Sequence, residues 1–239
     1  MYNTSVLDKV QKPGIVAIAC PEGNFQHVLD YHESSSPRSD KSLVLDIAFP
    51  LYSPSSRLRV YDRSPFRNIG TIVGATFIRD HRGLWLLSFD GDDKITIPDH
   101  ASLDMGTGDF AIAVCVKTSN VVTQPWVVSK WAAGNTGYGI DITNAGKVRA
   151  NIGDIDGFVT SPGNADISDG VLHLFKVNFD RSDNATVYID DAFDNIADIS
   201  DVEKDISTAV DLTLGVNLIF PSSLTGSIGE VWIKKGGLF

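Results

Sequence analysis

Glutamate, cysteine and long apolar runs are all scarce in this chain of 239 residues. Glutamate favours helices, whereas aspartate favours turns and caps. Of the 30 acidic residues only four are glutamate, namely Glu22, Glu33, Glu203 and Glu230. This imbalance indicates strands joined by many turns. We find no helical apolar stripe longer than a turn or two, and Val202–Thr208 is the best candidate for a short helix.

The two cysteines, Cys20 and Cys115, are too few for the disulfide framework of a small secreted domain. One disulfide between them is an open alternative. Cys115 lies inside a strand-like run, which predicts a small core residue, and two free thiols would fit a reducing compartment. A chain of this length buries roughly 70–75% of the surface that it exposes when unfolded. Folding therefore requires neither a disulfide nor a metal.

Clusters of basic residues and membrane-length apolar segments are also missing. The chain has 20 Lys+Arg and a formal net charge of -10, so it lacks the positive patches that nucleic acids and anionic membranes require. No stretch approaches the ~20 apolar residues of a membrane span. The longest apolar run near the N-terminus, residues 15–20, is too short for a signal-peptide core. We expect no signal peptide and no transmembrane segment.

Apolar residues that recur with period two are abundant. Phe110, Ile112, Val114 and Val116 share one face of a strand-like run, and small residues occupy its other face, which indicates a strand buried on both faces. Similar runs occur at 172–180, 185–191, 212–216 and 229–235, with aspartate- and glycine-containing turns between them. The pattern predicts an all-β fold, an antiparallel β-sandwich of jelly-roll type.

A polar run at 34–40, SSSPRSD, reads as a linker and divides the chain near residue 42. Residues 1–42 contain one strand-like run, at 15–19, and are predicted to be an N-terminal arm. Residues 43–239 are predicted to form the sandwich. The arm could dock on a protein partner or add a strand to a neighbour.

Five segments resemble, in order, the laminin-G-like, concanavalin A-like jelly-roll family. They are VYDRSPFRNIGTIVGATF (60–77), LSFDGDDKITIPDHASLDMGTGDFAIAVCVK (87–117), VVSKWAAGNTGYGIDI (127–142), VLHLFKVNFDRSDNATVYIDD (171–191) and GSIGEVWIKK (226–235). The resemblance covers residues 43–239 and does not extend to 1–42. It implies the same sandwich fold and a binding role, often outside cells and often toward carbohydrate.

The resemblance also implies a structural Ca²⁺ where the opening turn meets the closing strand. Asp62 matches a position that could supply a carboxylate, the kind of ligand that calcium prefers. In the closing strand the family has an acidic pair, of which this chain keeps Glu230, whereas Gly229 occupies the other acidic position.

For carbohydrate binding, the useful chemistry is an exposed aromatic platform beside polar loop groups. Trp131 stands at a loop edge where the family commonly has a small residue, and Asn135, Tyr138 and Phe158 could join it. The alternative is that Trp131 caps the edge of the core. The other tryptophans lie in strand-like runs and are predicted to be core residues, namely Trp85, Trp126 and Trp232.

Catalytic patterns are few. There is no G-x-S-x-G elbow and no phosphate loop. Asp154 and Asp156 would share a face if their segment were a strand, as a glycoside hydrolase needs, although a turn explains them better. Four residues near the N-terminus have side chains that can bind a metal, namely His27, Asp30, His32 and Glu33. The two histidines are five residues apart and share no face of a strand or helix, so we do not expect a metal site there.

We therefore expect a protein that is not an enzyme. The first hypothesis is a structural component of a virion surface, such as a phage capsid decoration or tail protein, which the arm would anchor to a capsid or tail protein or to another copy. The second is a lectin-like module that binds extracellular or host glycans. The third is a glycoside hydrolase. The location would be the virion surface in the first case, and extracellular or cell-surface otherwise.

Overall fold

A computed structural model describes residues 16–17, 28–29, 40–47, 58–81 and 83–236. Within these residues the elements are strands, apart from one short 3₁₀ helix, η1 (Ala101–Leu103). The predicted all-β class is confirmed. No helix in the described ranges is long and apolar enough to cross a membrane.

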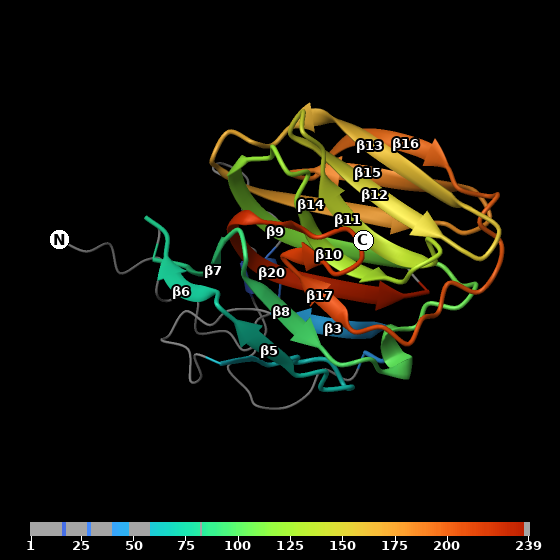
Figure 1. Cartoon of the computed structure of the whole chain (residues 1–239), viewed down its shortest axis with the longest axis horizontal. Helices are drawn as coiled ribbons and strands as arrows, with labels where there is room; N and C mark the ends of the chain where they lie inside the picture. The colour runs from blue at the N-terminus through green and yellow to red at the C-terminus, as the bar shows by residue number, and fades with distance from the viewer. Residues whose placement is uncertain (1–15, 18–27, 30–39, 48–57, 82, 237–239) are drawn as a thin grey trace.

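Two antiparallel sheets lie face to face and form a sandwich (Figure 1). The first sheet has the spatial order β13 (Phe158–Asp166), β12 (Lys147–Gly153), β11 (Gly137–Ile142), β10 (Trp126–Trp131), β17 (Leu212–Leu214), β8 (Lys94–Ile97), β5 (Gly70–Val73) and β4 (Arg59–Val60). The second has the order β16 (Ala192–Asp198), β15 (Asn184–Ile189), β14 (Leu172–Phe179), β9 (Phe110–Asn120), β20 (Thr225–Lys235), β7 (Trp85–Asp90) and β6 (Thr76–Arg79), with β3 (Leu43–Ile47) beside β20.

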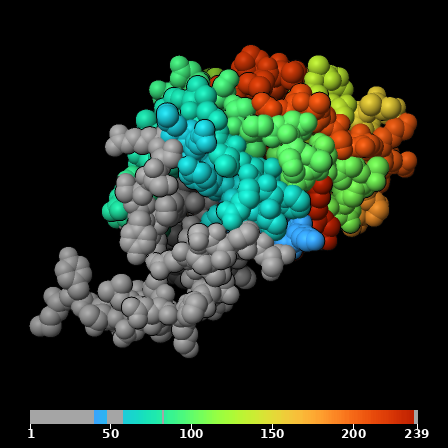
Figure 2. Space-filling model, turned by 90° about the horizontal axis from the view of Figure 1, so that it is seen from below, coloured from blue at the N-terminus to red at the C-terminus, as the bar shows by residue number. Residues whose placement is uncertain are grey.

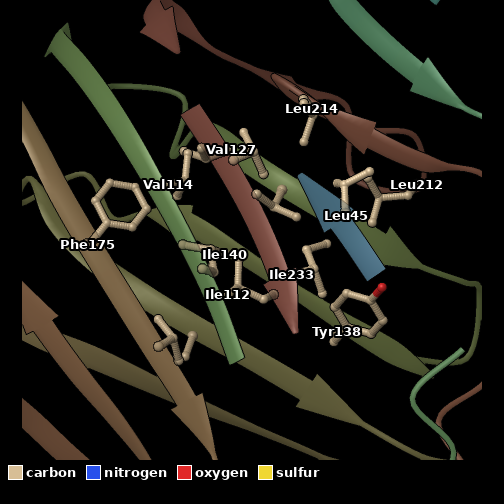
Figure 3. Packing of buried hydrophobic residues seen from close by; sticks show 14 of the residues in the cluster. Leu45, Ile112, Val114, Val127, Tyr138, Ile140, Phe175, Leu212, Leu214 and Ile233 are labelled. Carbon is tan, nitrogen blue, oxygen red and sulfur yellow. The ribbon is translucent and has the colours of Figure 1, made fainter. Parts of the chain in front are cut away.

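The main core fills the space between the sheets. Figure 3 shows Ile112 and Val114 of β9 and Phe175 of β14 packed near Ile140 and Tyr138 of β11. These side chains are buried because alternate residues of each strand point toward the opposite sheet. Burial of this apolar surface is the main term that stabilises the sandwich, at about 25 cal/mol per Å².

The second face of β9 is buried too, as its small residues predicted. Ala113 and Cys115 form a smaller cluster there with Leu174 of β14 and Trp232 of β20. Cys115 is disulfide-bonded in the structure, which corrects the hypothesis of two free thiols. Cys20 lies outside the described residues.

Aspartates organise many of the turns, as their abundance predicted. In each case a carboxylate oxygen accepts the backbone N–H two residues further along, the Asx-turn geometry. The residues that do so are Asp154, Asp166, Asp169, Asp180, Asp198 and Asp205. Most of the acidic excess therefore has a local structural role.

The predicted helix at Val202–Thr208 is wrong, because this segment has no helical turn. The buried guanidinium of Arg181 donates to the carbonyl oxygens of Val202 and of Lys204 (2.8 Å). A helix would need those carbonyls as its own acceptors. The backbone is instead pinned in an irregular path, with Val202 and Ile206 buried in the core.

In the N-terminal region, β1 (Val16–Ala17) pairs with β2 (Val28–Leu29), and the predicted strand at 15–19 includes β1. Strand β3 begins at Leu43 and pairs with β20. The boundary near residue 42 stays a prediction. The side chains of the acidic and histidine group predicted not to bind metal (His27, Asp30, His32, Glu33) lie outside the described residues.

Candidate functional site

An open depression of about 330 Å³ lies on the outer face of the first sheet, over β10 to β13. It is on the outer face because Tyr138, Ile140 and Ile152 of these strands point into the core, whereas their neighbours line the depression. We call it the groove. Its lining consists of Thr123, Gln124, Trp126, Trp131, Asn135, Asp141, Arg149, Asn151, Phe158, Thr160, Phe220 and Ser222.

Strand register brings the polar residues of the groove floor together. Asp141 of β11 is the cross-strand partner of Arg149 of β12, and Asn151 of β12 is the partner of Thr160 of β13. All four point outward, because they alternate with core residues along their strands. Side chains directly opposite on one face of a sheet are close enough to contact one another.

An ion pair with a buried carboxylate and a partly exposed guanidinium occupies the centre of the floor. Asp141 is fully buried, and its Oδ1 accepts hydrogen bonds from Nε of Arg149 (2.9 Å) and from Nδ2 of Asn151 (2.9 Å). The Nη2 group of Arg149 donates to Oδ2 of Asp141, so the contact is bidentate. This hydrogen bonding raises the pKa of Arg149 above its usual value, against the effect of burial.

Aromatic side chains form the walls. The rings of Trp126 and Trp131 lie 5.8 Å apart, and Phe158 stands edge-on to Trp131 at 6.4 Å. Phe158 is 53% exposed and Phe220 is 50% exposed, which is unusual for large apolar side chains. Trp131 is 5% exposed, and its indole N–H has no hydrogen-bond partner among the described residues. A buried donor without a partner costs free energy unless a ligand or water satisfies it.

Two glycines let these rings lie close to the sheet. A Cβ atom at Gly139 would lie 2.7 Å from the ring of Trp126. At Gly153 it would lie 2.7 Å from Cβ of Phe158 and 2.1 Å from the carbonyl oxygen of Asn135. Any larger residue would push the aromatic walls away from the floor.

Two residues of the groove have a left-handed backbone, Gln124 with φ 53° and Asn135 with φ 64°. Asparagine tolerates this conformation, but for glutamine it is strained. Hydrogen bonds hold Gln124 in place, since its N–H donates to the carbonyl of Val121 (3.0 Å) and its carbonyl accepts from Oγ of Ser222 (2.7 Å). Strained residues of this kind cluster at ligand-binding sites.

The structure brings together three of the four residues predicted for carbohydrate binding, because Trp131, Asn135 and Phe158 all line the groove. Tyr138 does not belong with them, and its prediction is corrected. It points into the core, is 1% exposed, and donates its hydroxyl to the carbonyl of Leu103 (2.8 Å). Burial raises the pKa of Tyr138 well above its usual value.

Sequence reasoning missed several residues of the groove. Trp126 is buried, as predicted, but on the groove side of the sheet rather than in the core between the sheets. The sequence does not mark Asp141, Arg149 and Asn151 as site residues, because each occupies an ordinary outward-facing position of its own strand. Phe220 follows two other apolar residues in a loop, and this exposed apolar run was the one available hint.

Asp62 lies two residues after β4, which is at the opposite edge of the first sheet from β13. The segment that includes β4 is drawn in cyan in Figure 2. Its Oδ1 accepts the N–H groups of Asp46 and Ser64, and its Oδ2 accepts the hydroxyl of Ser64 and the N–H of Asn68. Burial raises the pKa of Asp62, although these hydrogen bonds oppose the shift. Asp62 therefore organises the opening turn. Glu230 lies partly buried on β20, and calcium binding by these two residues stays a prediction.

Asp154 and Asp156 form a turn between β12 and β13, as the preferred interpretation held. The buried Asp154 accepts the N–H groups of Asp156 (2.8 Å) and Lys204 (2.9 Å), while Asp156 pairs with the Lys204 ammonium. Burial alone would raise the pKa of Asp154, but these hydrogen bonds lower it overall. Such a carboxylate stays ionised and is a poor general acid.

A second acidic group consists of Asp90, Asp92 and Asp93, whose carboxylate oxygens lie within 4.8 Å of one another. These residues form the turn between β7 and β8, where Oδ2 of Asp93 accepts the N–H of Asp90 (3.0 Å). Burial raises the pKa of Asp93. The contacts are those of a tight turn, the role that the sequence predicted.

No family model matches this chain, and no curated protein matches it. Solved structures do. The binding domain of Paraclostridial Mosquitocidal Protein 1 superposes with a TM-score of 0.66 at 13% identity, over 83% of this chain and 50% of that one. The botulinum neurotoxin serotype D ligand-binding domain, solved with N-acetylneuraminic acid, gives 0.60 at 12% identity, over 83% and 48%.

Domain 4 of AbnA, an extracellular arabinanase from Geobacillus stearothermophilus solved with arabinotriose, gives a TM-score of 0.61 at 19% identity. The match covers 83% of this chain and 94% of that domain. The chain thus spans about half the length of the toxin domains and nearly all of the arabinanase domain. The hypothesis of a phage capsid or tail component stays a prediction. The chain shares the β-sandwich fold of carbohydrate-binding and receptor-binding domains.

Proposed function

We propose that this protein is a carbohydrate-binding module and that the groove is its binding site. The observation that carries the proposal is the pairing of exposed aromatic walls with a buried polar floor. Phe158 and Phe220 offer apolar faces, and Arg149 and Asn151 are polar groups held in position beside them. Sugars have both kinds of surface, because one face of the ring presents C–H groups and its edge presents hydroxyls.

The ring of Trp131 and the size of the groove also fit the proposal. Trp131 lines the groove, while its indole N–H is enclosed and has no partner among the described residues. The volume of about 330 Å³ falls at the lower end of the roughly 300–1,000 Å³ typical of small-molecule sites, which suits a short oligosaccharide or the end of a longer chain.

The similar structures support a binding role. Both AbnA domain 4 and the serotype D domain were solved with sugars, arabinotriose and N-acetylneuraminic acid respectively. At 12–19% identity this is support from the fold, and the groove supplies the chemistry.

The groove is built for binding rather than for glycoside hydrolysis. A glycosidase of the usual kind needs two carboxyl groups on either side of the scissile bond. The described lining contains a single carboxylate, that of Asp141, and Arg149 and Asn151 already occupy it.

The test is a glycan array followed by titration calorimetry on the strongest hits. Phe158→Ala removes an exposed wall with little effect on the core. We expect it to weaken binding by about 0.5–1.5 kcal/mol, the scale of an aromatic contact, or roughly two- to twelve-fold. Trp131→Ala removes a larger ring from the groove lining and should weaken binding further.

The matched control is Phe193→Ala on β16. Phe193 is also an exposed phenylalanine, at 62%, but it lies on the second sheet and does not line the groove. Binding should be unchanged in this variant. If no glycan binds the wild-type protein, or if Phe158→Ala and Phe193→Ala bind equally well, the proposal is refuted.

A further inference from the structure

We infer that the groove selects neutral oligosaccharides, those without carboxylate, sulfate or phosphate groups. The inference rests on the proposed function and names the class of its ligand. It follows from how the charges of the groove are arranged and from which hydrogen-bonding groups are left for a ligand.

The charges of the groove cancel. Asp141 and Arg149 are the charged residues among the twelve that line it. Two hydrogen bonds join them, one of them 2.9 Å long, and the carboxylate is fully buried. A hydrogen-bonded pair of opposite charges carries no net charge, because each charge is compensated at contact distance; here the guanidinium is 26% exposed. The whole chain carries a formal charge of -10, and this background field disfavours an anionic ligand.

One of the two sides of the guanidinium that could bind an anion is already in use. An arginine binds a carboxylate best through two parallel N–H groups. In Arg149, Nε and Nη2 both donate to Asp141, and Nη2 also lies 3.4 Å from Oε1 of Gln124. On the Nε side an acidic sugar would have to displace the carboxylate of Asp141, and on the Nη1 side it would compete with Gln124 for Nη2.

The remaining polar groups of the lining suit hydroxyls. They include the amide of Asn135, the amide oxygen of Asn151 and the hydroxyl of Thr160. Amides and hydroxyls both donate and accept, as sugar hydroxyls do. None of these groups carries a charge, so contacts with them reward a neutral ligand.

The first experiment compares matched pairs of probes on the full-length protein. An array presents lactose beside sialyllactose, and neutral arabinotriose and galactotriose beside trigalacturonate, and hits are titrated at 50 and 500 mM NaCl. We expect neutral glycans to bind, with a Kd that changes less than twofold with salt, because no net charge is involved. If only the acidic partners bind, the inference is overturned while the proposed function stands. If nothing binds, both fail.

The second experiment creates the preference that the wild-type protein lacks. Asp141→Asn keeps the shape of the side chain but leaves Arg149 uncompensated. We expect this variant to bind acidic probes at least tenfold more tightly than the wild type does, with an affinity that falls as salt rises. An Asp141→Asn protein that folds but gains no affinity for acidic probes would contradict the inference.

A variant outside the buried pair keeps the test decisive if Asp141→Asn does not fold. Thr160→Lys adds a positive charge at an exposed position of the groove floor. It should also raise affinity for acidic probes at low salt. Thr76→Lys on β6 adds the same charge at an exposed position of the second sheet, and it should not. Equal gains from the two lysine variants would overturn the inference, because the preference would then follow total charge.

Discussion

Lys130 is a buried cation whose replacement should destabilise the protein by a calculable amount. It lies on β10, immediately before Trp131, and its side chain is 1% exposed. Its ammonium donates to Oδ1 of Asp99 (2.5 Å) and to the carbonyl oxygens of Thr208 (2.8 Å) and Val210 (2.9 Å). All three donors of the lysine are therefore satisfied, and together they tie β10 to the segment that leads into β17.

Lys130→Met keeps the length of the side chain and removes the charge and all three hydrogen bonds. Removing one partner of a buried ion pair costs about 3–5 kcal/mol. The cost here should fall near the lower end, about 3 kcal/mol, because the two carboxylates that pair with Lys130, those of Asp99 and Asp104 (3.4 Å), are 35% and 28% exposed and water can solvate them in part. For a chain of this size, 1 kcal/mol corresponds to roughly 2–4 °C in Tm, so we expect Tm to fall by about 6–12 °C.

The assay is urea unfolding followed by tryptophan fluorescence and circular dichroism. The midpoint should fall while the m-value stays constant, because the variant exposes the same surface on unfolding. The matched control is Lys204→Met, since Lys204 pairs with Asp156 and both side chains are more than half exposed, at 52% and 59%. An exposed pair contributes about 0–1 kcal/mol. Equal losses in the two variants would refute the reasoning that burial makes the Lys130 contacts strong.

Three further predictions concern pH, the groove and calcium. Hydrogen bonding to Asp190 raises the pKa of His173. The contribution of this contact to the stability of the fold is therefore fully present below about pH 6.5 and is lost as pH rises through the raised pKa. His173→Gln should lower Tm by roughly 2–4 °C at pH 6 and by less at pH 8.5, and an equal loss at both pH values would contradict this. Gly139→Ala places a Cβ atom 2.5 Å from the carbonyl oxygen of Val128 and 2.7 Å from the ring of Trp126, so strand β10 and the ring must both shift; calorimetry on folded protein should show glycan affinity falling about fivefold or more, and unchanged affinity would show that the position of this wall does not matter. Asp62 and Glu230 are predicted to bind calcium, so Tm should be higher in CaCl₂ than in EDTA, and an unchanged Tm would argue against the site.

Part of the groove could be predicted from sequence, because some of its residues are unusual for their local context. Trp131 and Phe158 are large aromatics at loop edges, and Asn135 lies in a glycine-rich loop. Tyr138 was assigned to the wrong side, although period two in GYGIDI already places it with Ile140, a core residue. In a strand, a shift of one residue moves a side chain to the opposite face.

The polar floor could not be predicted in this way. Asp141, Arg149 and Asn151 come from two strands, and what makes them a site is that β11 and β12 are neighbours in this register. Trp126 faces the groove because the register of β10 and β11 shifts between Trp126 and Val128. Such a shift depends on pairing with the next strand and leaves no mark in the local alternation.

The sequence by itself determined the class of fold and the role of most of its aspartates, which is to form turns. Alternating apolar residues specify strands, and an aspartate-rich, glutamate-poor composition specifies turns, because both effects act within a few residues of the chain. The tertiary structure alone decided where binding chemistry gathers. Strand order and register bring Asp141 and Arg149 into one neutral pair beneath the aromatic walls, and contacts between distant strands are set by packing of the whole core rather than by local preference.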